Sequence, residues 1–310
     1  MKLLVSTIKR GANPSEPSSS VYTLSDCNYA VGAAPNVQDA ALRRFDSNPR
    51  GGMRGARGVA VGDGATFVAN FDSVFRYDRA WNLKGVTSHP WCADIHDIAL
   101  HDGRLWVAST RNDCLVQFDL DGNVRDIVDP WGMGFVEEAF GVPRKREVTV
   151  DDLRDPRTHE KSQTDRLHLN SFAFTDAGDL IISLGQIRVN GHCESALVKL
   201  GASGGVELIH RNAEAPVPAH NIVALPDGRL LHCDTGGRQV VAIEPQSGCV
   251  QPIIKMFGGY TRGLCRLNDD RMAVGVQNEV WMFDPDRAGH VERIRISDDP
   301  RESIHSIVCA

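Results

Sequence analysis

The sequence predicts an all-β fold, a six-bladed β-propeller in which the two ends of the chain share one blade. Short apolar runs alternate with turn residues along most of the 310 residues. One pattern recurs six times, and its last copy stops after a single strand. Strands that match the missing part stand at the other end of the chain. A closed ring of blades explains these observations, because closure leaves no sheet edge open.

The repeat is clearest at Asp94–Thr110, DIHDIALHDGRLWVAST, where a histidine precedes two apolar strands joined by an Asp-Gly turn. The six copies begin at Arg57, His96, Asn170, His220, Arg262 and His305. Most copies are spaced about 40 to 50 residues apart, which suits a four-stranded blade. The longer gap between the second and third copies predicts an insertion over 129–165, a possible lid over a pocket.

The ends of the chain supply the remaining blade. The segments 2–7 and 21–26 resemble the middle strands of other copies, and 304–309 resembles a first strand. We therefore predict one domain over 1–310, with helix only at 37–45 and in parts of the insertion. The interval between the first residue and the turn is six residues in some copies and seven in others. Turn lengths or the alignment must therefore differ by one residue, which would exchange the two faces of a strand.

Composition narrows the function. The net charge is −6 and no basic stripe is present, so nucleic acid is not an expected partner. No apolar segment is long enough to span a membrane, and the N-terminal apolar run is too short for a signal peptide. The eight cysteines form no CxxC pair. This pattern favours reduced thiols and a cytoplasmic location.

In a propeller, the first strand of each blade lines the central channel, so the six first residues should form a ring at one end of it. Histidine stands there on alternate blades, at His96, His220 and His305. His168 lies two residues before Asn170 and could be a fourth ligand or an acid/base group. Converging imidazoles without carboxylates favour a divalent transition metal such as Fe, Cu or Zn.

Arginine and polar residues complete the predicted site. Arg57 and Arg262 would hold a small anionic substrate with forked donors, and with His168 they form the predicted catalytic set. The predicted substrate-binding residues are Asn170 of the ring and four rim residues, Asn112, Gln186, Arg188 and Gln277. Asn70 and Thr235 are further possible rim contacts. Glu137 and Glu138 of the insertion are further acid/base candidates.

Three functions fit this pattern. The first is a metal-dependent lyase or oxygenase that acts at the channel mouth. The second is a metal-free transferase or hydrolase with a catalytic histidine and an arginine anion clamp. The third is a propeller that only binds partners. Under each alternative, the sequence does not define the oligomeric state of the protein.

The runs DIHDIALHDGRLWVASTRNDCLVQFD, DRLHLNSFAF and GYTRGL resemble a bacterial family of single-domain six-bladed β-propellers. The resemblance covers about residues 55–310, and His305 departs from the family pattern. The residues that carry it are His96, Asp97, His168, Asn170, His220 and Arg262. The resemblance implies the fold but no agreed reaction. More distantly, the blades are similar to gluconolactonase-like, strictosidine-synthase-like and NHL-repeat propellers. Gluconolactonase-like propellers use carboxylates around their metal, which this ring lacks.

Overall fold

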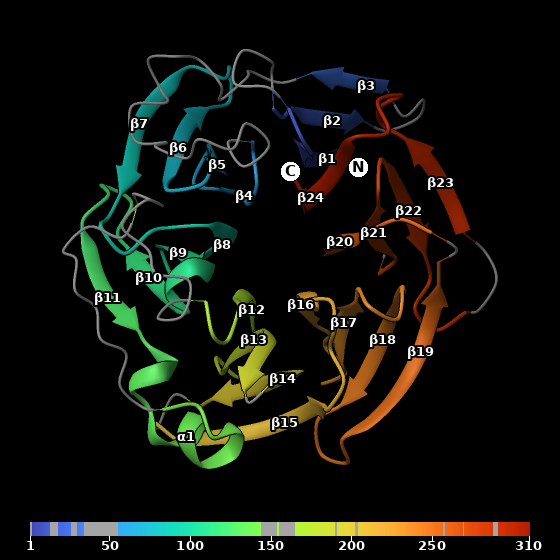
Figure 1. Cartoon of the computed structure of the whole chain (residues 1–310). Helices are drawn as coiled ribbons and strands as arrows, with labels where there is room; N and C mark the ends of the chain where they lie inside the picture. Colours follow the sequence, from blue (N-terminus) through green and yellow to red (C-terminus); the bar gives the residue numbers. More distant parts are fainter. Residues whose placement is uncertain are drawn as a thin grey trace.

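The computed structural model describes residues 2–12, 18–25, 30–33, 55–143, 154, 165–189, 191–201, 204–256, 258–268, 270–287 and 291–310. In this part of the chain, six four-stranded antiparallel sheets stand around a central axis (Figure 1). The first strand of each repeat is innermost. The predicted six-bladed β-propeller is therefore confirmed.

Five blades are built from consecutive strands, named here from the channel outward. Blade one contains β4 (Val59–Gly62), β5 (Ala65–Ala69), β6 (Ser73–Asp78) and β7 (Leu83–Ser88). Blade two contains β8 (Ile95–His101), β9 (Arg104–Ser109), β10 (Cys114–Phe118) and β11 (Val124–Val128), with a 3₁₀ turn at Thr110–Asn112. Blade three contains β12 (Leu169–Phe174), β13 (Leu180–Val189), β14 (His192–Leu200) and β15 (Val206–Asn212).

The remaining two consecutive blades follow the same order. Blade four contains β16 (His220–Ala224), β17 (Leu230–Asp234), β18 (Gln239–Glu244) and β19 (Cys249–Lys255). Blade five contains β20 (Thr261–Arg266), β21 (Met272–Val276), β22 (Glu279–Phe283) and β23 (Val291–Arg295).

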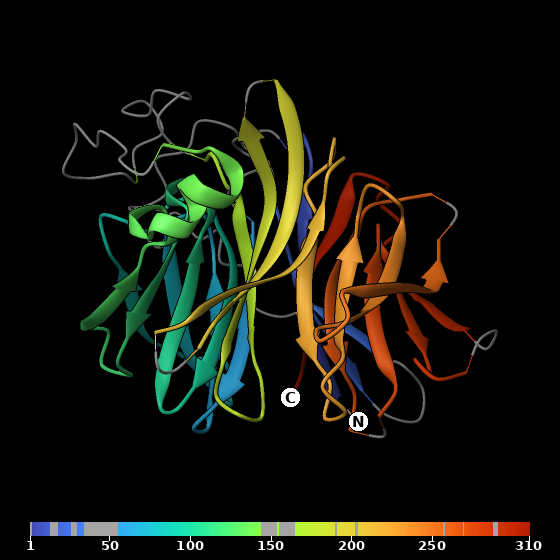
Figure 2. The same cartoon turned by 90° about the horizontal axis from the view of Figure 1, so that it is seen from below.

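Blade six joins the two ends of the chain. It contains β24 (Glu302–Cys309), β1 (Lys2–Lys9), β2 (Val21–Ser25) and β3 (Ala30–Ala33). The three predicted strands are confirmed, and β3 completes the sheet. Polar contacts reinforce the closure, since the carboxylate of Glu302 accepts hydrogen bonds from the Thr7 hydroxyl and from Tyr22 at 2.9 Å. The ends therefore lie side by side (Figures 1 and 2).

The core consists of six apolar clusters, each between two neighbouring blades. Phe75 and Phe118, for example, are fully buried. Successive side chains of a strand point to opposite faces of its sheet. Continuous apolar runs such as Met272–Val276 therefore supply both faces, with Ala273 and Val274 in different clusters. Because every blade packs on its two neighbours, the positions of the innermost strands are fixed relative to one another.

The insertion is described only in part. Its first residues form a 3₁₀ turn at Pro130–Gly132 and the helix α1 (Gly134–Phe140). Val136 and Phe140 anchor this helix in the core between blades two and three. Most of 144–164 lies outside the described residues, as does the predicted helix at 37–45, so the lid stays a prediction. In the described part of the chain, no helix has the length and apolar character needed to cross a membrane.

The uncertainty of one residue in the repeat has two structural causes. Blades one and two close their first hairpin with two residues, whereas blades three to five use five-residue turns. In addition, five innermost strands contain a β-bulge near their start. His96, Asn170 and His305 are the extra residues of their bulges, while His220 and Arg262 precede theirs. A bulge redirects side chains. The extra residue of one bulge and the residue before another can therefore both face the channel.

Candidate metal centre

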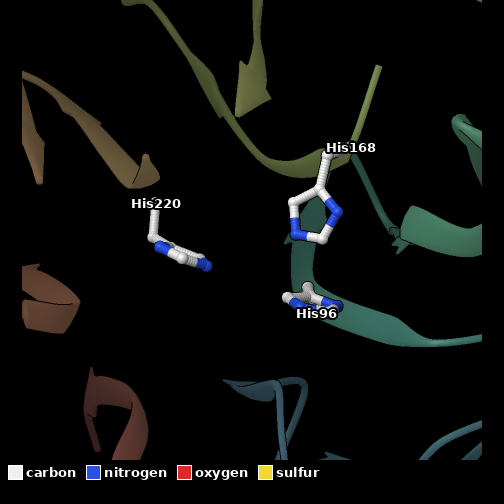
Figure 3. Close-up of side chains that lie close together, drawn as sticks. All are labelled: His96, His168 and His220. Carbon is white, nitrogen blue, oxygen red and sulfur yellow. The ribbon is translucent and has the colours of Figure 1, made fainter. Parts of the chain in front are cut away.

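Three buried histidines converge in the channel. His96, His168 and His220 each offer a ring nitrogen, and these atoms all lie within 4.8 Å of one another. The ring centroids of His96 and His168 are 5.3 Å apart, and those of His96 and His220 are 6.2 Å apart. Figure 3 shows the three rings gathered around one point. This spacing could hold a metal ion.

An irregularity of the backbone, a β-bulge or a residue with positive φ, directs each histidine toward this point. His96 is the extra residue of the bulge in β8, and Asp94 before it has a φ of 55°. His168 precedes β12 and itself has a φ of 51°, so it enters from the loop rather than from the strand. His220 is the first residue of β16 and is followed by Asn221, with a φ of 45°. Left-handed non-glycine residues are uncommon and cluster at functional sites.

The Nδ1 atoms of all three rings face outward, each to a separate oxygen. Nδ1 of His96 donates to the backbone carbonyl of Asp94 at 2.8 Å. Nδ1 of His168 donates to the carboxylate of Asp165 at 2.7 Å, and Nδ1 of His220 lies 2.9 Å from the Thr235 hydroxyl. These contacts leave the three Nε2 atoms for the centre. Metal-binding histidines have this arrangement, because the outer hydrogen bond fixes the tautomer and orients the ring.

Burial keeps His96 and His220 neutral. It is the main cause that lowers the pKa of both rings well below the ordinary value, and the positive charge of Arg262 acts in the same direction. Neutral imidazole is the form that binds a metal. The protonation of these two donors therefore suits a transition metal.

His305 lies beside the three histidines but outside the group within 4.8 Å. Its ring centroid is 5.3 Å from that of His96, and only 3% of the residue is exposed. Neither ring nitrogen has a hydrogen-bond partner among the described residues. Burial, followed by the charge of Arg262, lowers the pKa of His305 well below its ordinary value. Of the four predicted ligands, the structure therefore brings His96, His168 and His220 together and places His305 beside them.

Arg57 is already paired within the protein. Its NH1 group lies 2.5 Å from the carboxylate of Asp94 and 3.0 Å from the carbonyl of Ile95. Burial alone would raise the pKa of Asp94, but Arg57 and other nearby charges hold it well below its usual range. The charge of Arg57 is therefore balanced by Asp94. Its hydrogen bond to Ile95 also stabilises the backbone next to His96.

Arg262 has a different environment. Its NH2 group contacts Nε2 of His220 at 2.5 Å, and among the described residues no carboxylate forms an ion pair with it. Burial, with Arg10 and Arg57 nearby, lowers the pKa of Arg262 to about 9, so the guanidinium remains charged at neutral pH. Arg10 lies over the ring of Tyr260, 4.4 Å from its centroid. The site thus has a cation that faces its histidines without a protein anion.

The polar residues expected to contact substrate form hydrogen bonds within the protein. Asn170 donates to the carbonyl of Ala219 at 2.5 Å, and Asn112 donates to that of Trp91 at 2.6 Å. The other three donate to loop carbonyls or to Asp165: Gln186, Arg188 and Gln277. Of the two further candidates, Asn70 accepts from its own turn and Thr235 supports His220. These contacts shape the rim, and the role of the residues in substrate binding stays a prediction.

Glu137 and Glu138 are exposed on α1, at the outer edge of the ring (Figure 1). Asp94 and Asp165 are the functional partners that sequence reasoning missed. Each stands two or three residues before a site histidine, in the runs DIH and DRLH. An acid so close in the sequence is a signal that could have identified both partners.

No family model and no curated protein matches this chain. Solved structures do. A nidogen/laminin complex aligns with a TM-score of 0.62 at 10% identity, over 99% of this chain and 97% of that chain. A putative gluconolactonase aligns with a TM-score of 0.54 at 15% identity, over 78% of each chain.

A streptogramin B lyase aligns with a TM-score of 0.51 at 12% identity, over 80% of this chain and 71% of that one. The expected likeness to propellers of the gluconolactonase and lyase type is therefore confirmed for the fold. At these identities the likeness extends to the fold alone.

Proposed function

We propose that this protein is a metal-dependent enzyme that acts on a small anionic metabolite at the mouth of the propeller channel. His96, His168 and His220 would hold a divalent Fe, Cu or Zn ion. The observation that carries the proposal is the outward hydrogen bond from Nδ1 of each ring. Each bond satisfies a buried N–H and also fixes the tautomer whose lone pair, on Nε2, lies on the side where the three rings converge.

An anionic substrate follows from the charge around the histidines. Asp94 balances Arg57 and Asp165 pairs with Arg188, but Arg262 lacks such a partner among the described residues. A buried guanidinium is best stabilised by a carboxylate or phosphate that binds its fork. Arg10 is exposed nearby and adds positive charge at the same end of the channel. Both features support a carboxylate or phosphate group on the substrate.

His305 is the residue we assign to proton transfer. It is buried beside His96, and both of its nitrogens lack protein partners among the described residues. A neutral imidazole with a free nitrogen can accept a proton from a bound substrate. A metal held by three neutral histidines would supply Lewis-acid polarisation of a substrate oxygen. Together these groups favour a lyase, in which a base removes a proton while charge develops on an oxygen, over an oxygenase.

The proposal is tested by elemental analysis of protein produced without a histidine tag. We expect close to one equivalent of Fe, Cu or Zn in the wild type and a loss of that metal in the His96→Ala/His220→Ala double variant. The matched control is His192→Ala/His210→Ala, which removes two histidines of blade three and should retain the metal. A wild type that takes up no metal, even from supplemented medium, would contradict the proposal.

One observation favours a second candidate function. Nε2 of His220, the atom offered to a metal, is in contact with Arg262. A metal-free transferase or hydrolase could use this pair to hold an anion while His305 serves as the base. Folded, metal-free protein that loses anion binding on His305→Gln or Arg262→Met substitution would favour this alternative.

A further inference from the structure

The contact between Arg262 and His220 has a defined direction. The hydroxyl of Thr235 donates to the backbone carbonyl of Thr261 at 3.0 Å, so it must accept the hydrogen bond from Nδ1 of His220. Nδ1 therefore carries the proton and Nε2 carries the lone pair. The NH2 group of Arg262 donates to that lone pair.

The lone pair of Nε2 has room for one partner. A metal ion needs it for coordination, and the guanidinium needs it as a hydrogen-bond acceptor. The two cannot use it together. A metal that binds all three histidines must therefore displace Arg262 from His220.

Displacement requires a new partner for Arg262. The residue is only 8% exposed, and its Nε atom has no hydrogen-bond partner among the described residues. A buried cation without partners is costly. Arg57 and Arg188, by contrast, are paired with Asp94 and Asp165. The chain thus provides anions for two arginines near the site, but Arg262 would receive its anion from a ligand.

We propose that Arg262 couples anion binding to metal binding. With no anion present, Arg262 occupies Nε2 of His220 and weakens the metal site. A carboxylate or phosphate group that engages Arg262 withdraws it and frees Nε2, so the metal and the anionic substrate bind cooperatively. This inference rests on the proposed function. By linkage, the metal must strengthen anion binding by the same factor.

The test is a titration of the metal-free protein with Co²⁺, followed by calorimetry and by visible absorption. It is performed in sodium chloride and, at equal ionic strength, in sodium sulfate or sodium acetate. We expect sulfate or acetate to tighten Co²⁺ binding to the wild type by about tenfold or more. Arg262→Met should bind Co²⁺ tightly in chloride alone and should show no effect of sulfate or acetate. Arg266→Met is the matched control, because Arg266 lies on the same strand and pairs at the surface with Asp270.

The outcomes separate the two proposals. If neither the wild type nor Arg262→Met binds Co²⁺ in any salt, the metal site itself is refuted. If both bind Co²⁺ equally and no anion has an effect, the site stands and the coupling is refuted. Weaker binding by Arg262→Met in chloride also refutes the coupling, because Arg262 would then support the site. The wild-type comparison of salts remains decisive if the variant does not fold.

Discussion

The polar side chains in the two halves of the channel differ in their hydrogen-bond and ion-pair partners. On the side of blades one to three, Arg57 is paired with Asp94, and His168 is paired with Asp165, which also holds Arg188. On the side of blades five and six, Arg262 donates to an imidazole lone pair, and the ring nitrogens of His305 have no hydrogen-bond partner among the described residues. The first half therefore balances its charges within the protein. The second half contains the cation and the imidazole that we propose to act on a ligand.

The largest effect is expected from breaking the pair in the first half. Arg57→Met leaves the Asp94 carboxylate buried without its partner, since the two side chains are only 3% and 10% exposed. We expect a loss of about 3–5 kcal/mol in the free energy of unfolding, measured by urea titration. The exposed Arg79→Met is the control. A loss below about 1 kcal/mol would show that the pair with Asp94 does not give Arg57 a structural role.

The next effect concerns the hydrogen bond that orients His168. Asp165→Asn keeps an oxygen for Nδ1 but removes the negative charge. We expect metal affinity to fall by about 10- to 100-fold, measured by calorimetric titration with Co²⁺ or Zn²⁺. Asp176→Asn, in an exposed turn of blade three, should have no effect. Unchanged affinity in Asp165→Asn would remove His168 from the metal site.

A smaller effect, of opposite sign, is expected in the second half. His305→Leu replaces a buried ring whose nitrogens lack partners, so the free energy of unfolding should rise by about 1 kcal/mol or stay level. His220→Leu should instead be destabilising, because it leaves Arg262 and Thr235 without their partner. Equal losses in the two variants would show that His305 has a structural partner.

The last expected effect is a change in pH dependence. The pKa of His305 is well below its ordinary value in the folded protein, so between that pKa and about 6.5 the unfolded chain binds more protons. The free energy of unfolding must therefore fall as pH drops below about 6.5. His305→Leu should make this fall shallower by at most about 1.4 kcal/mol per pH unit, measured by urea titrations between about pH 7.5 and 5. The other histidines with a lowered pKa keep the remaining slope: His96, His210, His220 and His232. An unchanged slope would show that His305 does not titrate.

The sequence predicted the fold well because local patterns determine it. Alternating strands, Asp-Gly turns and the incomplete last repeat at His305 sufficed to place the blades and their closure. Residues of the site were predicted because the first position of each innermost strand must line the channel. Which of them converge closely enough to hold a metal was not predictable. That choice depends on bulges and left-handed residues, such as those around His96 and His168, which shift side chains by one position without a clear signature in the pattern.

The closure of blade six also orders events during synthesis. His305 is on β24, which packs between β1, β4 and β20 and is the last strand of the described chain to be made. Ile304 and Ile307 lie against Gly263, whose φ of 73° belongs to the bulge after Arg262. A nascent chain therefore lacks His305 and a closed wall beside Arg262 until the last strand is made. The chemistry that we propose for this site must await the docking of that strand, so we expect a chain that ends before β24 to be inactive.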